Sequence, residues 1–247
     1  MSLTNKRRVE VCFSPRQYDL YKKGFDTCVV IDVLRATTAI AVAIDTGLKS
    51  VIPVSTVEEA KEYQKKGYLA AAERGGEIVP GFDFGNSPYT YMDSDLIGKE
   101  VVLTTTNGTK SINIASEMKT VIIGALVNLE AVCEWLIEHD QDVLLLGSGW
   151  KDKFNLEDTI CAGAIADTLI KSGNFYANGD STIAAKFISR SAKENIFSFL
   201  KASSHRRRLI KLNLNQDINY CLTPNTISSV PILENKKIVK STVYQKV

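Results

Sequence analysis

The sequence of 247 residues lacks the features that mark several common protein classes. No apolar stretch approaches the roughly 18 uninterrupted residues that a membrane-spanning helix requires. The basic N-terminus leads into a short alternating segment, Val9 to Phe13, which predicts a strand and not a signal-peptide core. The five cysteines are scattered and include no C-x-x-C pair, so they suggest neither a disulfide framework nor a thiolate zinc site. We therefore expect a cytoplasmic protein with reduced thiols and no membrane partner.

Histidine is scarce, and familiar hydrolase signatures are missing. His139 and His205 are the only histidines, too few for an imidazole-based dimetal site. There is no G-x-S-x-G nucleophile elbow, and no cysteine is followed six residues later by arginine. Asp32 is followed by Val33 and Leu34, so a paired-aspartate motif of aspartyl-phosphate chemistry is absent there. His139 is expected to be solvated at a helix end, and His205, which precedes three arginines, is the better candidate for a site.

The net charge of +2 conceals an asymmetry along the chain. Residues 1–185 carry 18 basic and 25 acidic side chains, a charge of −7, whereas residues 186–247 carry 12 and 3, a charge of +9. A basic final quarter suits nucleic acid, an anionic small molecule or complementarity within the molecule. Its densest part, residues 205–208, lacks interleaved aromatic residues and matches no nucleic-acid-binding motif. We expect no nucleic-acid partner.

Strands and helices alternate along most of the chain. Apolar patterning predicts strands at 9–13, 27–33, 50–54, 99–105, 120–124 and 142–146, and helices at 35–46, 57–66, 107–118, 128–139 and 155–171. Such repeated units predict an α/β fold of three layers, α/β/α, around a mostly parallel, mixed sheet. We expect a single domain over residues 8–247. Its part from 180 to 247 is predicted to be basic and mainly helical, with three short helices and a strand at 220–222.

Ligands of a parallel sheet bind beyond the carboxyl ends of its strands, and polar residues follow several of the predicted strands. Asp32 ends an apolar strand, where a carboxylate needs a cation or hydrogen-bond donors. Arg35, Thr37 and Thr38 follow at a helix N-terminus, which favours anions. The alternative is a structural Asp–Arg pair with threonine caps.

Two further segments combine glycine with polar side chains. The stretch from Glu73 to Pro88 contains Arg74 and several glycines in mid-domain, where long loops are usually functional. The alternative interpretation is a structural turn anchored by its phenylalanines. Asn107 and Thr109 follow another strand and suit an anion at a helix start, or simply cap that helix.

The fourth segment places two carboxylates together. Glycines at 147 and 149 release the chain from a strand, and Glu157 and Asp158 then occupy the first turn of a helix. The helix dipole alone favours acidic residues there. Oxygen-rich groups near strand ends are also what Mg²⁺ requires.

Taken together, these segments resemble the 2-phosphosulfolactate phosphatase family. The matching segments are residues 30–38, 73–76, 81–88, 104–109, 156–158 and 204–217. The resemblance implies an α/β fold distinct from the common phosphatase folds. It also implies a Mg²⁺-dependent enzyme that releases phosphate from 2-phosphosulfolactate, a step in coenzyme M synthesis. Where the family has a Cys-Ala-Gly turn, this chain has Gly147-Ser148-Gly149.

The predicted roles follow from this chemistry, in which phosphoryl transfer to water needs positioning and charge stabilisation. We predict Mg²⁺ ligands among Asp32, Glu157 and Asp158, which would polarise an attacking water. The predicted catalytic residues are Asp32, Arg35 and His205, and the predicted substrate-binding residues are Arg74, Thr37, Thr38, Asn107 and Thr109. The expected partner is an anionic phosphorylated small molecule, 2-phosphosulfolactate or a similar phosphorylated hydroxy acid, and a homo-oligomer is expected. The alternative is a non-catalytic anion-binding domain, which would need the arginines and threonines but not the carboxylates.

Overall fold

The apolar run after residue 26 forms β2 (Thr27–Ile31), a strand in which every residue is buried. In the computed structural model, which describes residues 6–242, this strand pairs in parallel with β7 (Thr120–Gly124) on one side and β8 (Val143–Gly147) on the other. Its alternate side chains, Val29 and Cys28, enter hydrophobic cores on opposite faces of the sheet. Burial on both faces explains why the run shows no polar alternation.

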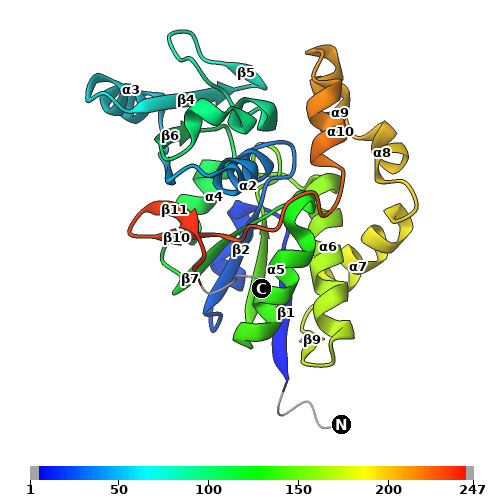
Figure 1. Cartoon of the computed structure of the whole chain (residues 1–247). Helices are drawn as coiled ribbons and strands as arrows, with labels where there is room; N and C mark the ends of the chain where they lie inside the picture. The colour runs from blue at the N-terminus through cyan, green and yellow to red at the C-terminus, as the bar shows by residue number, and fades with distance from the viewer. Residues whose placement is uncertain (1–5, 243–247) are drawn as a thin grey trace.

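Within residues 6–242, eleven strands form one sheet in the order β5-β4-β6-β3-β11-β10-β7-β2-β8-β1-β9 (Figure 1). The other strands are β1 (Arg7–Cys12), β3 (Ser50–Pro53), β4 (Leu69–Arg74), β5 (Glu77–Ile78), β6 (Glu100–Thr104), β9 (Phe175–Ala177), β10 (Pro231–Glu234) and β11 (Lys237–Lys240). One parallel group contains β4, β6 and β3, and the other contains β7, β2, β8, β1 and β9. The antiparallel hairpin β10–β11 joins the two groups. The sheet is therefore mixed and mostly parallel, as predicted.

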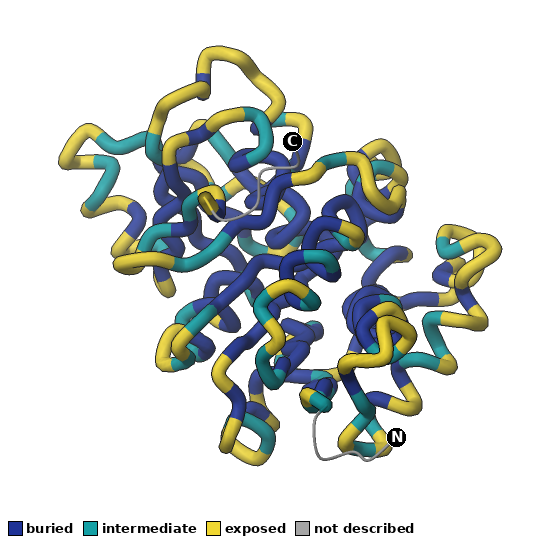
Figure 2. Tube along the Cα trace, turned by 60° about the horizontal axis from the view of Figure 1, so that its bottom comes forward, coloured by how far each residue is buried: buried dark blue, intermediate teal, exposed yellow. Residues whose placement is uncertain are grey.

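Helices cover both faces of the sheet. They are α1 (Tyr18–Tyr21), α2 (Ala36–Thr46), α3 (Val57–Lys65), α4 (Gly108–Ala115), α5 (Leu129–His139), α6 (Leu156–Lys171), α7 (Asp180–Ala192), α8 (Ile196–Phe199), α9 (Ser204–Lys211) and α10 (Asn215–Cys221). Side chains of α5 and α6 share a core with Val29, whereas those of α2 and α4 share the core that contains Cys28. Figure 2 shows the buried strands at the centre and the exposed segments at the outer loops. The three-layer α/β/α prediction is confirmed.

The C-terminal portion differs in detail from the prediction. Residues 220–222 do not form a strand, because they lie at the end of α10, whose Ile218 and Cys221 are fully buried on one helical face. Between residues 180 and 242 the chain forms four α-helices instead of the three predicted helices, followed by the unpredicted hairpin of β10 and β11. Residues 243–247 of the predicted domain lie outside the described residues.

Two further features bear on the sequence-based expectations. All five cysteines are buried and unpaired. Among residues 6–242, none of the helices combines the length and apolar character needed to cross a membrane.

Candidate active site

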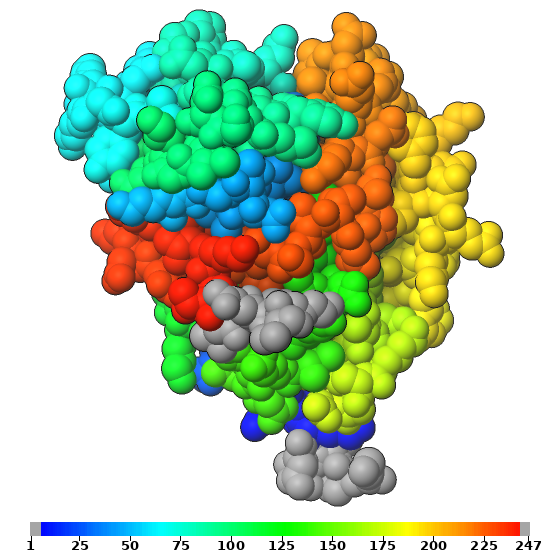
Figure 3. All heavy atoms as spheres, viewed as in Figure 1, coloured from blue at the N-terminus to red at the C-terminus, as the bar shows by residue number. Residues whose placement is uncertain are grey.

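A pocket lies where the segments after β2, β4, β6 and β8 meet α9. It is lined by Asp32, Leu34, Arg35, Glu73, Gly76, Asn86, Thr106, Asn107, Trp150, His205, Arg208 and Leu209. A cavity of about 410 Å³ adjoins it and shares Arg35, Gly76 and Asn86. In Figure 3 the cyan-green segment around residue 85 and the orange helices α9 and α10 lie side by side at the top of the molecule. The pocket thus combines the main α/β part of the chain with its basic C-terminal portion.

Asp32 follows β2 directly and lines this pocket while remaining almost fully buried. Burial, and then the nearby carboxylates of Asp158 and Glu73, raise the pKa of Asp32 well above its ordinary value. The start of α4 approaches this carboxylate closely, because a Cβ added at Gly108 would stand 2.9 Å from Asp32 Oδ2 and 2.4 Å from the Ala36 Cβ. Glycine is therefore required at position 108.

Thr37 and Thr38 are buried and shape the turn that presents Asp32. The Thr37 hydroxyl accepts a hydrogen bond from the Asp32 backbone N–H at 2.9 Å. The Thr38 hydroxyl donates to the Val33 carbonyl at 2.8 Å. Both hydroxyls are engaged by the backbone, and neither residue lines the pocket.

Arg35 lines the pocket and is held from two sides. Its guanidinium forms a buried ion pair with Asp217 of α10 and donates to the Gly76 carbonyl at 2.8 Å. Asp217 in turn accepts a hydrogen bond from the Ser87 hydroxyl at 3.0 Å. The peptide bond between Leu34 and Arg35 is cis. This network ties the C-terminal portion and the glycine-rich segment to the end of β2.

Arg74, the predicted substrate-binding arginine of the glycine-rich segment, is not among the lining residues. Its guanidinium donates to the Glu73 carbonyl at 2.6 Å and to the Thr104 hydroxyl at 3.0 Å. Glu73 lines the pocket instead, and its carboxylate accepts hydrogen bonds from the backbone N–H groups of Gly76 at 2.5 Å and Thr106 at 3.2 Å. The segment therefore reaches the site through Glu73 and Gly76.

Asn107 and Thr109 have different positions at the start of α4. Asn107 lines the pocket, and its Oδ1 accepts a hydrogen bond from the Lys151 backbone N–H at 3.3 Å. Thr109 is fully buried, and its hydroxyl accepts from the Thr105 N–H and donates to the Thr105 carbonyl. Of the two, only Asn107 reaches the pocket.

Asp158 accepts hydrogen bonds from the backbone segments around the site. Its carboxylate accepts hydrogen bonds from the backbone N–H groups of Val33 at 2.9 Å and Gly149 at 3.0 Å, and from the Asn155 amide at 2.9 Å. Asn155 caps α6 by accepting from the Asp158 N–H. Burial and the adjacent Glu157 raise the pKa of Asp158 to about 7, against the opposing effect of these donors.

A side-chain contact between Glu157 and His205 joins α6 to α9. Glu157 is fully buried, and its Oε1 lies 2.5 Å from His205 Nδ1. Its Oε2 is buried and has no hydrogen-bond partner among the described residues. The His205 ring stacks on Trp150, with ring centroids 5.4 Å apart. His205 is therefore fixed on one side by a carboxylate and on its face by an indole.

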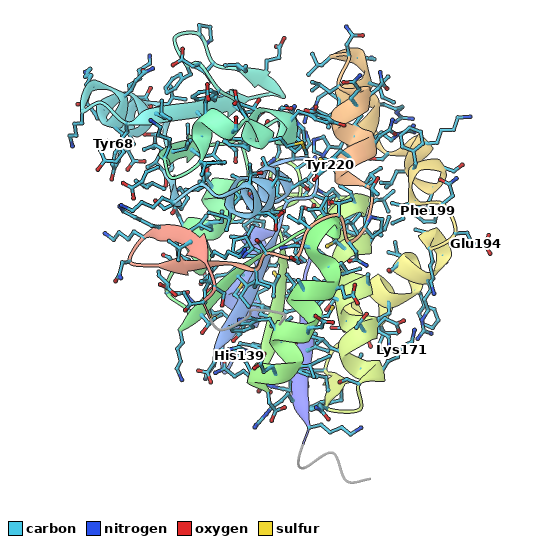
Figure 4. The ribbon with its side chains drawn as sticks, viewed as in Figure 1. Tyr68, His139, Lys171, Glu194, Phe199 and Tyr220 are labelled. Atoms are coloured by element: carbon cyan, nitrogen blue, oxygen red, sulfur yellow. The ribbon has the colours of Figure 1, made fainter. Side chains whose placement is uncertain are left out.

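His139 lies elsewhere. Figure 4 places it low in the view at the end of α5, far from α9. Its ring is partly buried and stacks on Trp135 at 3.4 Å, and its Nδ1 contacts the Trp135 carbonyl at 2.8 Å.

The three carboxylates predicted to share Mg²⁺ do not form one ligand cluster. Within residues 6–242, no group of three or more His, Cys, Asp or Glu side chains is arranged to hold a metal ion. Asp158 already has three donors, and Glu157 contacts His205. Asp32 alone of the three lines the pocket. A site built from all three carboxylates does not fit this arrangement.

Comparisons with known proteins give the family. A family model described as 2-phosphosulpholactate phosphatase matches residues 12–236. The chain belongs to the 2-phosphosulfolactate phosphatase family. A Thermotoga petrophila protein named "Probable 2-phosphosulfolactate phosphatase" is 41% identical over 210 residues, which cover 85% of this chain and 89% of that protein. Proteins of the same name from Caldanaerobacter subterraneus and Clostridium novyi are each 37% identical; the alignments cover 84% and 87% of this chain, and 87% and 92% of those proteins.

Several pocket residues of this family member were not predicted from the sequence: Glu73, Asn86, Trp150 and Arg208. One signal was available for Arg208, because residues three apart on a helix share a face and His205 was already a candidate. Trp150, in a turn of small residues, carried no comparable signal. The ion-pair partner of Arg35, Asp217, is 182 positions away from it, and no local pattern joins the two.

Proposed function

We propose that the protein hydrolyses 2-phosphosulfolactate, or a similar phosphorylated hydroxy acid, to the hydroxy acid and phosphate. Family membership carries this proposal, since relatives bearing the phosphatase name align with more than four-fifths of the chain. The pocket supports it chemically, because two guanidinium groups, a histidine and two carboxylates line it. Charge-assisted bonds from arginine suit each anionic group of such a substrate.

His205 is suited to donate a proton to the leaving oxygen. Its Nδ1 contacts Glu157, so Nε2 is the ring nitrogen left for the substrate. A carboxylate on one imidazole nitrogen fixes the tautomer and orientation of the ring. Protonation of the leaving group by a positioned histidine is general acid catalysis.

Arg35 and Asp32 complete the arrangement. Asp217 and the Gly76 carbonyl hold the Arg35 guanidinium in place, so that it binds an anion without a large loss of side-chain freedom. Asp32 is the lining carboxylate left to accept a hydrogen bond from the attacking water. Direct attack by water needs no covalent intermediate, and no cysteine lines the pocket.

Magnesium dependence stays a prediction. Mg²⁺ usually keeps several waters and binds through one or two carboxylates together with substrate phosphate oxygens. Asp32 can supply one such carboxylate, although a site built from all three predicted carboxylates does not fit the structure. A bound Mg²⁺ would supply positive charge to the phosphoryl oxygens and polarise a water.

The test is phosphate release from 2-phosphosulfolactate by the purified protein, with EDTA and with added Mg²⁺. Comparison with 2-phospholactate and p-nitrophenyl phosphate measures the contribution of the sulfonate and the carboxylate. We expect Mg²⁺-dependent release that is fastest with 2-phosphosulfolactate. Binding of the compound without release of phosphate would favour the anion-binding domain over the enzyme.

The cellular and assembly expectations also stay predictions. A cytoplasmic location agrees with five unpaired cysteines, and cell fractionation tests it. A homo-oligomer also stays a prediction, and light scattering of the purified protein tests it. Absence of nucleic-acid binding is tested by retention on DNA at two salt concentrations.

A further inference from the structure

The three arginines of α9 have three different environments. Arg206 is buried and stacks on Phe197, with its guanidinium carbon 3.9 Å from the ring centroid. Arg207 is exposed. Arg208 stacks on Trp150 at 3.3 Å and is the one of the three that lines the active-site pocket. Successive helical residues point in directions about 100° apart, so this divergence is expected on any helix.

Arg208 makes no hydrogen bond or ion pair to any described residue. Its Nε is buried without an acceptor. A guanidinium carries five N–H donors, and buried donors are rarely left unpaired. The side chain is therefore held by the indole face and lines the pocket, and its buried Nε–H is left without an acceptor.

Three carboxylates lie near Arg208, but among the described residues none of them forms an ion pair with it. Glu73 accepts from Gly76 and Thr106, and Glu157 contacts His205. The carboxylates of Glu73, Glu157 and Asp32 attract the Arg208 charge, whereas Arg35 repels it, and burial lowers the Arg208 pKa. Arg35 has Asp217 as its partner, whereas no carboxylate of residues 6–242 forms an ion pair with Arg208. An anion in the pocket would supply the acceptors that Arg208 lacks.

Trp150, on which Arg208 stacks, is held in place by its backbone. Its backbone exchanges two hydrogen bonds with Lys153, at 2.9 and 3.0 Å, which close a tight turn. The same indole contacts the His205 ring. One aromatic side chain thus sets the positions of both the proposed proton donor and the unpaired guanidinium.

We propose that Arg208, positioned by Trp150, binds a tetrahedral oxyanion of the substrate, either its phosphoryl group or its sulfonate. This inference rests on the proposed function and adds a specificity-determining residue to it. The planar fork of arginine matches two oxygens of such a group, and stacking on the indole reduces the freedom lost on binding. Trp150 acts as a positioning residue.

Steady-state kinetics of phosphate release test the inference. Arg208→Gln should raise KM for 2-phosphosulfolactate by about 10- to 100-fold, the usual effect of losing charged hydrogen bonds. Arg208→Lys keeps the positive charge but loses the planar pair of donors, so its KM should lie between those of the wild type and Arg208→Gln. Trp150→Leu should raise KM and Trp150→Phe should restore part of the loss. Arg207→Gln, the matched control at the exposed neighbour, should behave as the wild type.

A binding measurement separates the two anions. The chain has two tryptophans, of which Trp150 lies in the site, so titration with inorganic phosphate should change its fluorescence in a saturable way. Methanesulfonate is the second probe. A tenfold or greater loss of affinity in Arg208→Gln for phosphate assigns Arg208 to the phosphoryl group, and the same loss for methanesulfonate assigns it to the sulfonate. Trp150→Phe should abolish the signal.

Unchanged KM and unchanged affinity for both probes in Arg208→Gln would overturn the inference. The proposed function fails in a different way. In that case the wild type would release no phosphate from any substrate, whether or not phosphate binding depends on Arg208.

Discussion

His205 Nδ1 and Glu157 Oε1 lie 2.5 Å apart, although the residues are separated by 48 positions in the sequence. The contact joins the first turn of α6, at the edge of the sheet, to the start of α9 in the basic C-terminal portion. The Glu157 carboxylate is fully buried, so its negative charge acts on His205 with little screening by water. The position of His205 in the pocket therefore depends on a residue that does not itself line the pocket.

The first prediction concerns this pair. Glu157→Gln should lower kcat by about 10- to 100-fold, as is common when the partner that orients a functional histidine is changed. KM should change little, because Glu157 does not line the pocket. His205→Gln should lower kcat at least as much. The double variant should resemble His205→Gln alone, since the two residues act as a unit, and additive losses would contradict that dependence.

The second prediction concerns the pH dependence of stability. Burial and Glu157 raise the pKa of Asp158 to about 7 in the folded protein, against roughly 3.9 in an unfolded chain. Between these values the folded state binds a proton that the unfolded state does not. This bound proton adds to the free energy of unfolding. The added stability reaches its maximum below about pH 4 and is lost as the pH rises through 7.

Urea unfolding in EDTA at pH 4 to 8 measures this contribution. The stability of the wild type, compared with Asp158→Asn at each pH, should decline as the pH rises, because the variant cannot titrate at this position. A difference that stays constant would show that the three donors to Asp158 keep it ionised throughout.

Features that depend on neighbouring residues were predicted from the sequence, whereas features that depend on residues far away in the chain were not. Continuous apolar runs such as 27–31, and a local cap such as Asn155, depend on neighbouring residues, so the central strands and α6 were predicted. The hairpin of β10 and β11 was missed because its place in the sheet depends on β7 and β3, far away in the chain.

The same distinction applies to the site. Asp32, Arg35 and His205 line the pocket as expected from their segments. Thr37, Thr38 and Thr109 belong to those segments too, but their hydroxyls are engaged by nearby backbone groups, and a sequence pattern does not tell a turn-forming threonine from one that faces a ligand. Arg208 depends on the position of Trp150, 58 residues earlier, and only the folded chain places the two together.

The third prediction compares two neighbouring glycines that both have positive φ, 67° at Gly75 and 97° at Gly76. Alanine at either position should cost about 1–2 kcal/mol of stability through backbone strain. At Gly76 the new Cβ would also stand 2.7 Å from the Leu212 Cδ1, whereas at Gly75 it meets nothing within 4 Å.

Gly76→Ala should therefore be less stable than Gly75→Ala, by about 1 kcal/mol for the added crowding. It should also raise KM more, because the Gly76 carbonyl holds Arg35. Equal losses in the two variants, measured by urea unfolding and steady-state kinetics, would mean that Leu212 moves aside freely.

The fourth prediction is that replacing Asp32 has opposite effects on activity and on stability. Burial and the nearby carboxylates raise the pKa of Asp32, so its negative charge disfavours the folded state when no cation is bound. Asp32→Asn should abolish phosphate release and yet raise stability in EDTA by about 0.5–2 kcal/mol, as at other sites where function requires an unfavourable group. Asp217→Asn is the matched control, since that buried carboxylate pairs with Arg35, and its loss should lower stability. Thermal unfolding of both variants decides the matter: if Asp32→Asn is destabilised as Asp217→Asn is, Asp32 is a structural partner and not a strained functional carboxylate.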